Sequence, residues 1–301
     1  MQRRLILSGF IFAALALAAA VPRAVAAATA SSTAPVASRD QAAAQHRLDQ
    51  LWPQVLAEAA RPATWAARRP VYARLAAHPS HSEDERTAEL SQQVATLETE
   101  LRYARAIRRA TGRDGACWGV ALRNCRPLAG GRLASEDGAI DLVWQAQRGF
   151  TPEQGVRGGI VVRAPARRAT AIVAWSYEGY DWQAPRLVEH RDRQFLAIAG
   201  RDVGAGNADL LYRRDGTTWR EVQLERWKDD LRTRLPADMD VRKAVDYDFA
   251  AMTARMSLWR EPDANCCPTG GEALARLDVE DDRLVLVDLK HITAVDLPRL
   301  R

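Results

Sequence analysis

Four cysteines carry the clearest chemical signal in this sequence. Cys266 and Cys267 are adjacent, and Cys117 and Cys125 lie well before them in the chain. In an oxidising compartment such thiols pair, and four cysteines allow three connectivities, between which the sequence does not choose. Bonds from Cys266 and Cys267 to the earlier pair would close loops of about 140 residues and contribute about 4–5 kcal/mol each in the chain-entropy model. We therefore predict that these cysteines form structural disulfides.

A redox or metal site at Cys266 and Cys267 is the alternative. A thioredoxin-like site requires C-x-x-C, and a zinc site requires paired ligands at spacings such as C-x₂-C or H-x₃₋₅-H. Neither spacing occurs in this chain. Thiol-redox exchange or copper binding by the adjacent thiols stays open as an alternative. No metal ion or other cofactor is predicted, and no catalytic residue is assigned.

Four aromatic residues and two acids fall within eight positions in the middle of the chain. The set consists of Trp175, Tyr177, Glu178, Tyr180, Asp181 and Trp182. Flat rings beside carboxylates suit stacking against sugar rings and hydrogen bonding to them, so this segment is the candidate ligand surface. The alternative is ordinary packing of aromatic rings across a turn between strands. Glu178 and Asp181 are also candidates for the carboxylate pair of a glycosidase.

Two loops rich in glycine and aspartate precede strand-like runs, at Ser135–Trp144 and Asp202–Tyr212. They resemble the loop–strand unit of FG-GAP and VCBS-type β-propeller repeats, in which a D-x-D-x-D-G-x-x-D loop holds calcium. The first loop keeps Asp137, Gly138 and Asp141 of that pattern, and the second keeps only Gly206 and Asp209. Calcium requires six to eight oxygen ligands, so we interpret these glycines as turn residues and predict no calcium site.

The first 26 residues are typical of a cleavable signal peptide. Arg3 and Arg4 precede an apolar run over Phe10–Val21, which is short for a membrane span, and Ala24-Val25-Ala26 matches a cleavage site. Retention of this segment as an anchor is the alternative. No later stretch is long and apolar enough to span a membrane, so we expect a periplasmic or secreted protein without a transmembrane segment after cleavage.

The charge pattern argues against nucleic acid as a partner. The formal net charge is +5, and loss of the three arginines in the signal peptide would lower it to +2. Only three of the 43 basic residues are lysines, and the basic residues are interspersed with acidic ones along the chain. A nucleic-acid-binding protein would show a clustered basic face instead.

The remaining pattern divides the chain into a linker over 27–44, a helical module over 45–112 and a disulfide-stabilised β-rich domain over 115–297. Helical periodicity predicts helices over 46–62, 65–77 and 82–111, the last with a capping box at Ser82 and Glu85. Beyond Gly112, eight short β-like runs are separated by turn signals, with two further helices predicted over 226–234 and 247–259. A three-residue hairpin loop is expected at Glu280–Asp282. The fold class is therefore α+β, with an N-terminal helical module followed by a mainly antiparallel β-sheet or sandwich-like body.

Together these patterns favour an exported, non-catalytic binding or interaction protein. Its partner would be a glycan or a protein of the cell envelope. A cell-wall or glycan hydrolase that uses carboxylates is the enzymatic alternative, and the thiol-redox or copper-binding protein is the third. Motifs of serine hydrolases, zinc peptidases and P-loop nucleotide-binding proteins are absent from the sequence.

Overall fold

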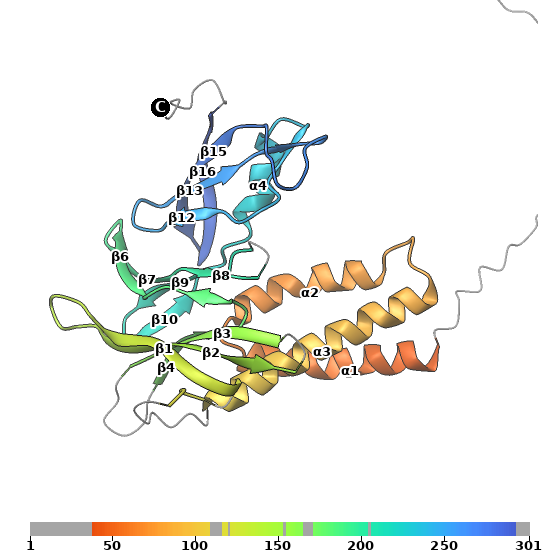
Figure 1. Ribbon diagram of the computed structural model, residues 1–301, viewed down its shortest axis with the longest axis horizontal. Helices are drawn as coiled ribbons and strands as arrows, with labels where there is room; N and C mark the ends of the chain where they lie inside the picture. The colour runs from red at the N-terminus through yellow and green to blue at the C-terminus, as the bar shows by residue number, and fades with distance from the viewer. Residues whose placement is uncertain are drawn as a thin grey trace, which may run out of the picture. The chain divides into compact units, whose positions relative to one another are not determined.

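The α+β class predicted from the sequence is confirmed. The computed structural model describes residues 38–108, 116–119, 121–152, 155–164, 171–203 and 206–292 (Figure 1). Within these residues, helices come first and antiparallel strands follow. The predicted signal peptide and most of the predicted linker lie outside the described residues.

The predicted helical module consists of three helices in the described part of the chain. They are α1 (Arg39–Glu58), α2 (Pro62–Ala76) and α3 (Glu83–Arg108). Helix α1 begins within the stretch assigned to the linker, because the Ser38 side chain accepts a hydrogen bond from the amide of Gln41 and caps it. The capping box is confirmed: Ser82 and Glu85 each bond the other's backbone amide, at 3.3 and 2.7 Å.

Most strands of the described chain form three four-stranded antiparallel sheets. The first sheet contains β1 (Arg123–Ala134), β2 (Asp141–Thr151), β3 (Gly155–Ala164) and β4 (Ala171–Ser176) in that order. The middle sheet has the order β10-β9-β7-β6, with β6 (Arg186–His190), β7 (Arg193–Ile198), β9 (Leu210–Asp215) and β10 (Thr218–Glu221). The third sheet contains β12 (Asp246–Asp248), β13 (Thr253–Ser257), β15 (Glu272–Glu280) and β16 (Arg283–Ile292).

Two short antiparallel pairs and one helix complete the β-rich body. The pairs are β5 (Asp181–Trp182) with β8 (Gly200–Arg201), and β11 (Met239–Asp240) with β14 (Trp259–Arg260). Helix α4 (Trp227–Arg234), which the sequence predicts, lies against β16 (Figure 1).

The middle sheet is buried on both of its faces. Along β7, Phe195 and Ala197 enter the core shared with the third sheet and α4, whereas Leu196 and Ile198 enter the core shared with the first sheet. Successive side chains of a strand point to opposite faces, so an uninterrupted apolar run fits a strand between two cores. The opposite face of the first sheet packs its Val161, Trp175 and Tyr177 against α3. Packing therefore runs from the helices through three sheets in succession, rather than through the two layers of a simple sandwich.

The helix predicted over Tyr247–Trp259 is wrong. The segment forms β12, a turn, β13 and β14. Within β13 and just beyond it, Ala254, Met256 and Leu258 alternate into the core, and β13 pairs with β15. Met252 has a φ of +48°, which no α-helix contains. The apparent helical spacing arises because this turn inserts residues between two strands that face the same core.

The hairpin predicted near the C-terminal end is confirmed, but its loop is shorter than expected. Glu280 pairs with Arg283, so Asp281 and Asp282 alone form the turn, with φ values of +47° and +58°. Two consecutive positive φ values are the signature of a type I′ turn, whose twist matches that of the flanking strands.

Candidate functional site

A cleft of about 520 Å³ lies where the helical module meets the β-rich body, and we call it the helix–sheet cleft. It is lined by Trp65 and Arg68 of α2, by Gln92, Ala95, Thr96, Thr99, Glu100 and Tyr103 of α3, and by Arg157, Tyr177, Glu178, Asp202 and Asn207 of the β-rich body. Its volume falls within the range of about 300–1,000 Å³ that is common for ligand pockets.

Glu178 belongs to the β-rich body and lies in this cleft opposite α2. Arg68 contacts one carboxylate oxygen at 2.6 Å, and Arg61 contacts the other at 3.2 Å. Burial acts to raise the pKa of Glu178, but Arg68 and Arg61 outweigh it and hold that pKa below its usual range. Glu178 is therefore ionised at neutral pH, and both of its oxygens are engaged by arginines.

Glu100 is the second carboxyl group in the cleft and behaves in the opposite way. Only 8 % of it is exposed, and burial raises its pKa to about 8, with the negative charge of Glu178 adding to the rise. The side-chain hydrogen bond with Trp65 and the charge of Arg68 act against this shift. Glu100 is therefore mostly protonated at neutral pH, so the cleft holds one neutral and one ionised carboxyl group.

Arg61 and Glu221 fix the α2 wall of the cleft to the middle sheet. Arg61 bonds Glu221 at 3.2 Å, and the Glu221 carboxylate accepts hydrogen bonds from the amides of Ala63 and Thr64 at 3.1 and 3.4 Å. Helix α2 has no capping side chain of its own, and a carboxylate at a helix N-terminus satisfies amides that the helix leaves free. A strand residue thus sets where Trp65 and Arg68 lie.

A second ion pair lies on the part of the cleft rim that the β-rich body forms. Arg157 of β3 contacts the Asp202 carboxylate at 2.5 Å and the backbone carbonyl of Glu178 at 3.3 Å. Beneath the rim, Tyr103 of α3 and Tyr177 pack with ring centroids 5.0 Å apart. The cleft thus has an aromatic floor and a rim of hydrogen-bond donors and acceptors.

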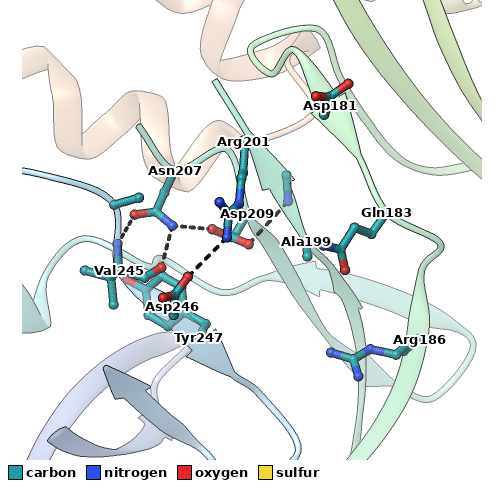
Figure 2. Close-up of a pocket in the computed structure, with 12 residues that line it drawn as sticks. Asp181, Gln183, Arg186, Ala199, Arg201, Asn207, Asp209, Val245, Asp246 and Tyr247 are labelled. Carbon is teal, nitrogen blue, oxygen red and sulfur yellow. Dashed lines mark hydrogen bonds and ion pairs between the residues drawn. The ribbon is translucent and has the colours of Figure 1, made fainter. Parts of the chain in front are cut away.

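A smaller cavity of about 170 Å³ lies beside the middle sheet, the β5–β8 pair and β12 (Figure 2). Two interactions join side chains that line it. Asn207 donates to Asp209 at 2.6 Å, and Arg201 contacts Asp246 at 3.3 Å. Burial raises the pKa of Asp209. The volume of this cavity lies below the range of about 300–1,000 Å³ that is common for ligand pockets, so the helix–sheet cleft is the better candidate site.

The candidate ligand surface predicted from the sequence is divided among several environments. Trp175 and Tyr177 face α3 and are buried. The Arg148 guanidinium carbon lies over the Tyr180 ring, 4.4 Å from the ring centroid. Trp182 packs at the edge of the core between the first and middle sheets.

The two acids of that surface line different cavities. Glu178 lines the helix–sheet cleft, whereas Asp181 pairs with Arg148 and lines the smaller cavity of Figure 2. The chain separates them because Gly179 and Tyr180 bond to different strands, the Gly179 carbonyl to Gly158 and the Tyr180 amide to Arg201. The structure therefore places Glu100, not Asp181, in the same cleft as Glu178.

The cysteines pair locally, Cys117 with Cys125 and Cys266 with Cys267. The long loops of the crossed connectivities are thus not closed. Cys117 and Cys125 are half-buried where β1 begins, and Cys266 and Cys267 are exposed on the loop between β14 and β15.

The first loop that resembles a calcium-binding repeat uses its acid to hold the turn itself. The Asp137 carboxylate accepts the amide of Ala139 at 3.0 Å. The second such loop lies partly outside the described residues. Across the described ranges, no cluster of three or more His, Cys, Asp or Glu side chains is arranged to hold a metal ion. In the same ranges, no helix combines the length and apolar character needed to cross a bilayer.

Sequence reasoning missed Arg61, Arg68, Glu100, Arg157 and Glu221. One of them carried a usable signal, since Glu100 lies three residues after Leu97 and four before Ala104, inside the apolar stripe of α3. A charged residue within such a stripe indicates a buried carboxyl group. The others lie on segments whose partners are distant in sequence, and nothing local marks them.

Comparison with known proteins identifies no family. No protein-family model matches the chain, and no curated protein matches it. Among solved structures, the crystal structure of xylan β-1,4-xylosidase from Bacillus halodurans C-125 aligns with 57 % of this chain at 16 % sequence identity. The chain covers 33 % of that protein's length, and the TM-score is 0.21. A TM-score this low does not describe a shared fold.

Proposed function

We propose that this protein is an exported, non-catalytic binding protein that holds a cell-envelope glycan in the helix–sheet cleft. The observation that carries the proposal is the make-up of the cleft. Its rim combines donors such as Arg68, Arg157 and Asn207 with acceptors such as Asp202, above buried aromatic rings. A glycan presents many hydroxyl groups, each of which donates and accepts, and an apolar face to each sugar ring.

The state of the carboxyl groups favours binding over hydrolysis. Both Glu178 oxygens are engaged by Arg61 and Arg68, and these contacts lower the nucleophilicity and basicity of the carboxylate. Protonated Glu100 is hydrogen-bonded to Trp65. Each group thus already has a hydrogen-bond partner within the protein.

A glycan hydrolase is the second candidate, and one observation favours it. Glu100 and Glu178 lie in one cleft with pKa values displaced in opposite directions. A protonated acid beside an ionised carboxylate is the pairing that glycosidases use.

Blocking the cleft tests the binding function without removing a contact. Ala95 is exposed on α3 and lines the cleft, so Ala95→Trp places an indole in the ligand volume. Ala88 lies two turns earlier on α3, is also exposed and does not line the cleft, so Ala88→Trp is the matched control. We expect Ala95→Trp to weaken co-sedimentation with purified peptidoglycan sacculi at least tenfold and Ala88→Trp to change it less than twofold. Equal binding by both variants would contradict the proposal.

Product release separates the two candidates. The binding protein should release no new reducing ends from sacculi, and Glu100→Gln should leave its sedimentation unchanged within about twofold, because the amide stays neutral like the protonated acid. Release of reducing ends by the parent protein, abolished in Glu100→Gln, would establish the hydrolase instead.

A further inference from the structure

The loop that carries Cys266 and Cys267 keeps its shape through hydrogen bonds that do not involve sulfur. One oxygen of the Asp263 carboxylate accepts the amides of Arg260 and Thr269 at 2.7 and 2.8 Å, and the other accepts the Thr269 hydroxyl at 2.7 Å. At the base of the loop, Leu258 and Gly270 are joined by a backbone bond of 2.9 Å. The backbone path is therefore set whether the two sulfur atoms are bonded or not.

The basic side chain of Arg242 supports the same loop from outside. Its guanidinium donates to the carbonyls of Asp263, Arg260 and Glu261, at 2.7, 2.9 and 3.3 Å. Breaking the bond between Cys266 and Cys267 would leave all of these contacts in place. The loop can thus present either a disulfide or two thiols on one scaffold.

The Cys266–Cys267 bond contributes little to stability as a cross-link. It joins residues one position apart, and the stabilisation that a disulfide gives by restricting the unfolded chain grows with the loop it closes. Cys117–Cys125 joins residues eight positions apart, and Cys125 packs against the core around Tyr103 and Trp175. Cys266 and Cys267 are both exposed, and exposed disulfides are the ones that thiols reach.

We propose that Cys266 and Cys267 form a reversible redox site that exchanges with small-molecule thiols. A thiolate attacks one Sγ atom, the bond between the two cysteines breaks, and the released cysteine thiolate takes up a proton from water. A second small thiol then attacks the mixed disulfide and leaves with the first as their disulfide. Two small thiols thus supply the two electrons, and both cysteines end as thiols.

Redox titration of the full, oxidised chain tests this site. The protein is equilibrated in glutathione buffers of increasing reduced-to-oxidised ratio, alkylated and mapped by mass spectrometry, so that Cys117–Cys125 serves as an internal reference. We expect Cys266 and Cys267 to be half-reduced at a ratio at least tenfold lower than the reference pair, to reoxidise when oxidised glutathione is restored, and to leave the circular dichroism spectrum unchanged. Reduction of both pairs together, or only on unfolding, would overturn the proposal.

Single-cysteine variants test the mixed disulfide directly. Cys267→Ser leaves Cys266 without its partner, so oxidised glutathione should trap one glutathione on Cys266, and Cys266→Ser should do the same at Cys267. The double variant Cys266→Ser/Cys267→Ser, with the Cys117–Cys125 bond intact, should take up none. Failure of both single variants to form the adduct would rule out exchange at this site.

Discussion

Glu221 accepts hydrogen bonds from both the backbone amide and the hydroxyl of Thr64, 157 positions earlier in the chain. A residue of β10 thereby caps helix α2. The Glu221 side chain is only 5 % exposed and also bonds Arg61, whose side chain is 12 % exposed. The contact is thus an almost fully buried charged cluster that fixes one wall of the helix–sheet cleft.

Replacing Glu221 should destabilise the protein strongly. Glu221→Ala leaves Arg61 with a missing partner and leaves two helix amides without an acceptor, so we expect a loss of about 3–5 kcal/mol in the free energy of unfolding. Urea unfolding followed by circular dichroism measures the change. Glu225→Ala is the control, because Glu225 is 64 % exposed and pairs with Lys228, and its loss should cost at most about 1 kcal/mol. Similar losses in the two variants would refute the capping role.

The pKa of Glu100 predicts a falling stability as pH rises. In the folded protein this pKa is about 8, against 4.5 as the ordinary value, so the folded state holds a proton that the unfolded state has lost between those pH values. The contribution of protonated Glu100 is fully present below about pH 4.5 and is lost as pH rises through about 8. Between these limits the group lowers the free energy of unfolding by about 1.4 kcal/mol per pH unit.

The variant Glu100→Gln should remove this slope, because its amide carries no charge at any of these pH values. We expect it to match the parent protein in urea unfolding at pH 5 and to exceed it at pH 8.5. Glu98→Gln is the control on the same helix, since Glu98 is half exposed and pairs with Arg47 at the surface. A parent protein whose stability stays flat from pH 5 to 8.5 relative to Glu100→Gln would disprove the assignment.

The two disulfides should differ in what they contribute to stability. Cys117 and Cys125 are eight positions apart, so replacing both by serine opens a short loop and should lower the free energy of unfolding by about 2–3 kcal/mol. The same change at the adjacent Cys266 and Cys267 should lower it by about 1 kcal/mol or less. Denaturant unfolding of the two double variants, side by side, gives the comparison. A larger loss for Cys266 and Cys267 would show that their bond is a structural cross-link after all.

A β-branched residue in the turn between β6 and β7 should lower the stability of the protein. Arg191 and Asp192 have φ values of +48° and +59°, a region that β-branched residues avoid. We expect Asp192→Val to lower the free energy of unfolding by about 1–2 kcal/mol and Asp192→Gly to leave it within about 0.5 kcal/mol. Asp288→Val makes the same change at an exposed position of β16, where extended backbone suits valine. Equal effects of the two valine substitutions in thermal unfolding would contradict this account of the turn.

Features encoded by neighbouring residues were predictable from the sequence. The Ser82–Glu85 capping box, the apolar stripe of α3 and the acidic hairpin turn each depend on a few consecutive positions, and each is present. The α+β class follows from the same local patterns, because helix and strand periodicities occupy separate parts of the chain.

Features that depend on distant residues were not predictable in this way. The arginine partners of Glu178 are Arg68 in α2 and Arg61 directly before it, both more than 100 positions earlier, and Glu221 meets Arg61 across 160 positions. The helix predicted over Tyr247–Trp259 was wrong for a related reason. The spacing of this segment fits a helix locally, but pairing of β13 with β15 decides its conformation. The sequence thus marked Glu178 as a candidate without indicating what surrounds it.

The capping of α2 by Glu221 has a consequence for the order in which the chain acquires its structure. As the chain is synthesised, α2 emerges long before β10, so the amides of Ala63 and Thr64 lack their acceptor until the chain has grown by a further 158 and 157 residues. Contacts between residues so far apart carry a large entropic cost of loop closure and form late. The helix–sheet cleft should therefore be among the last parts of the molecule to form, and a nascent or truncated chain that ends before Glu221 should lack it.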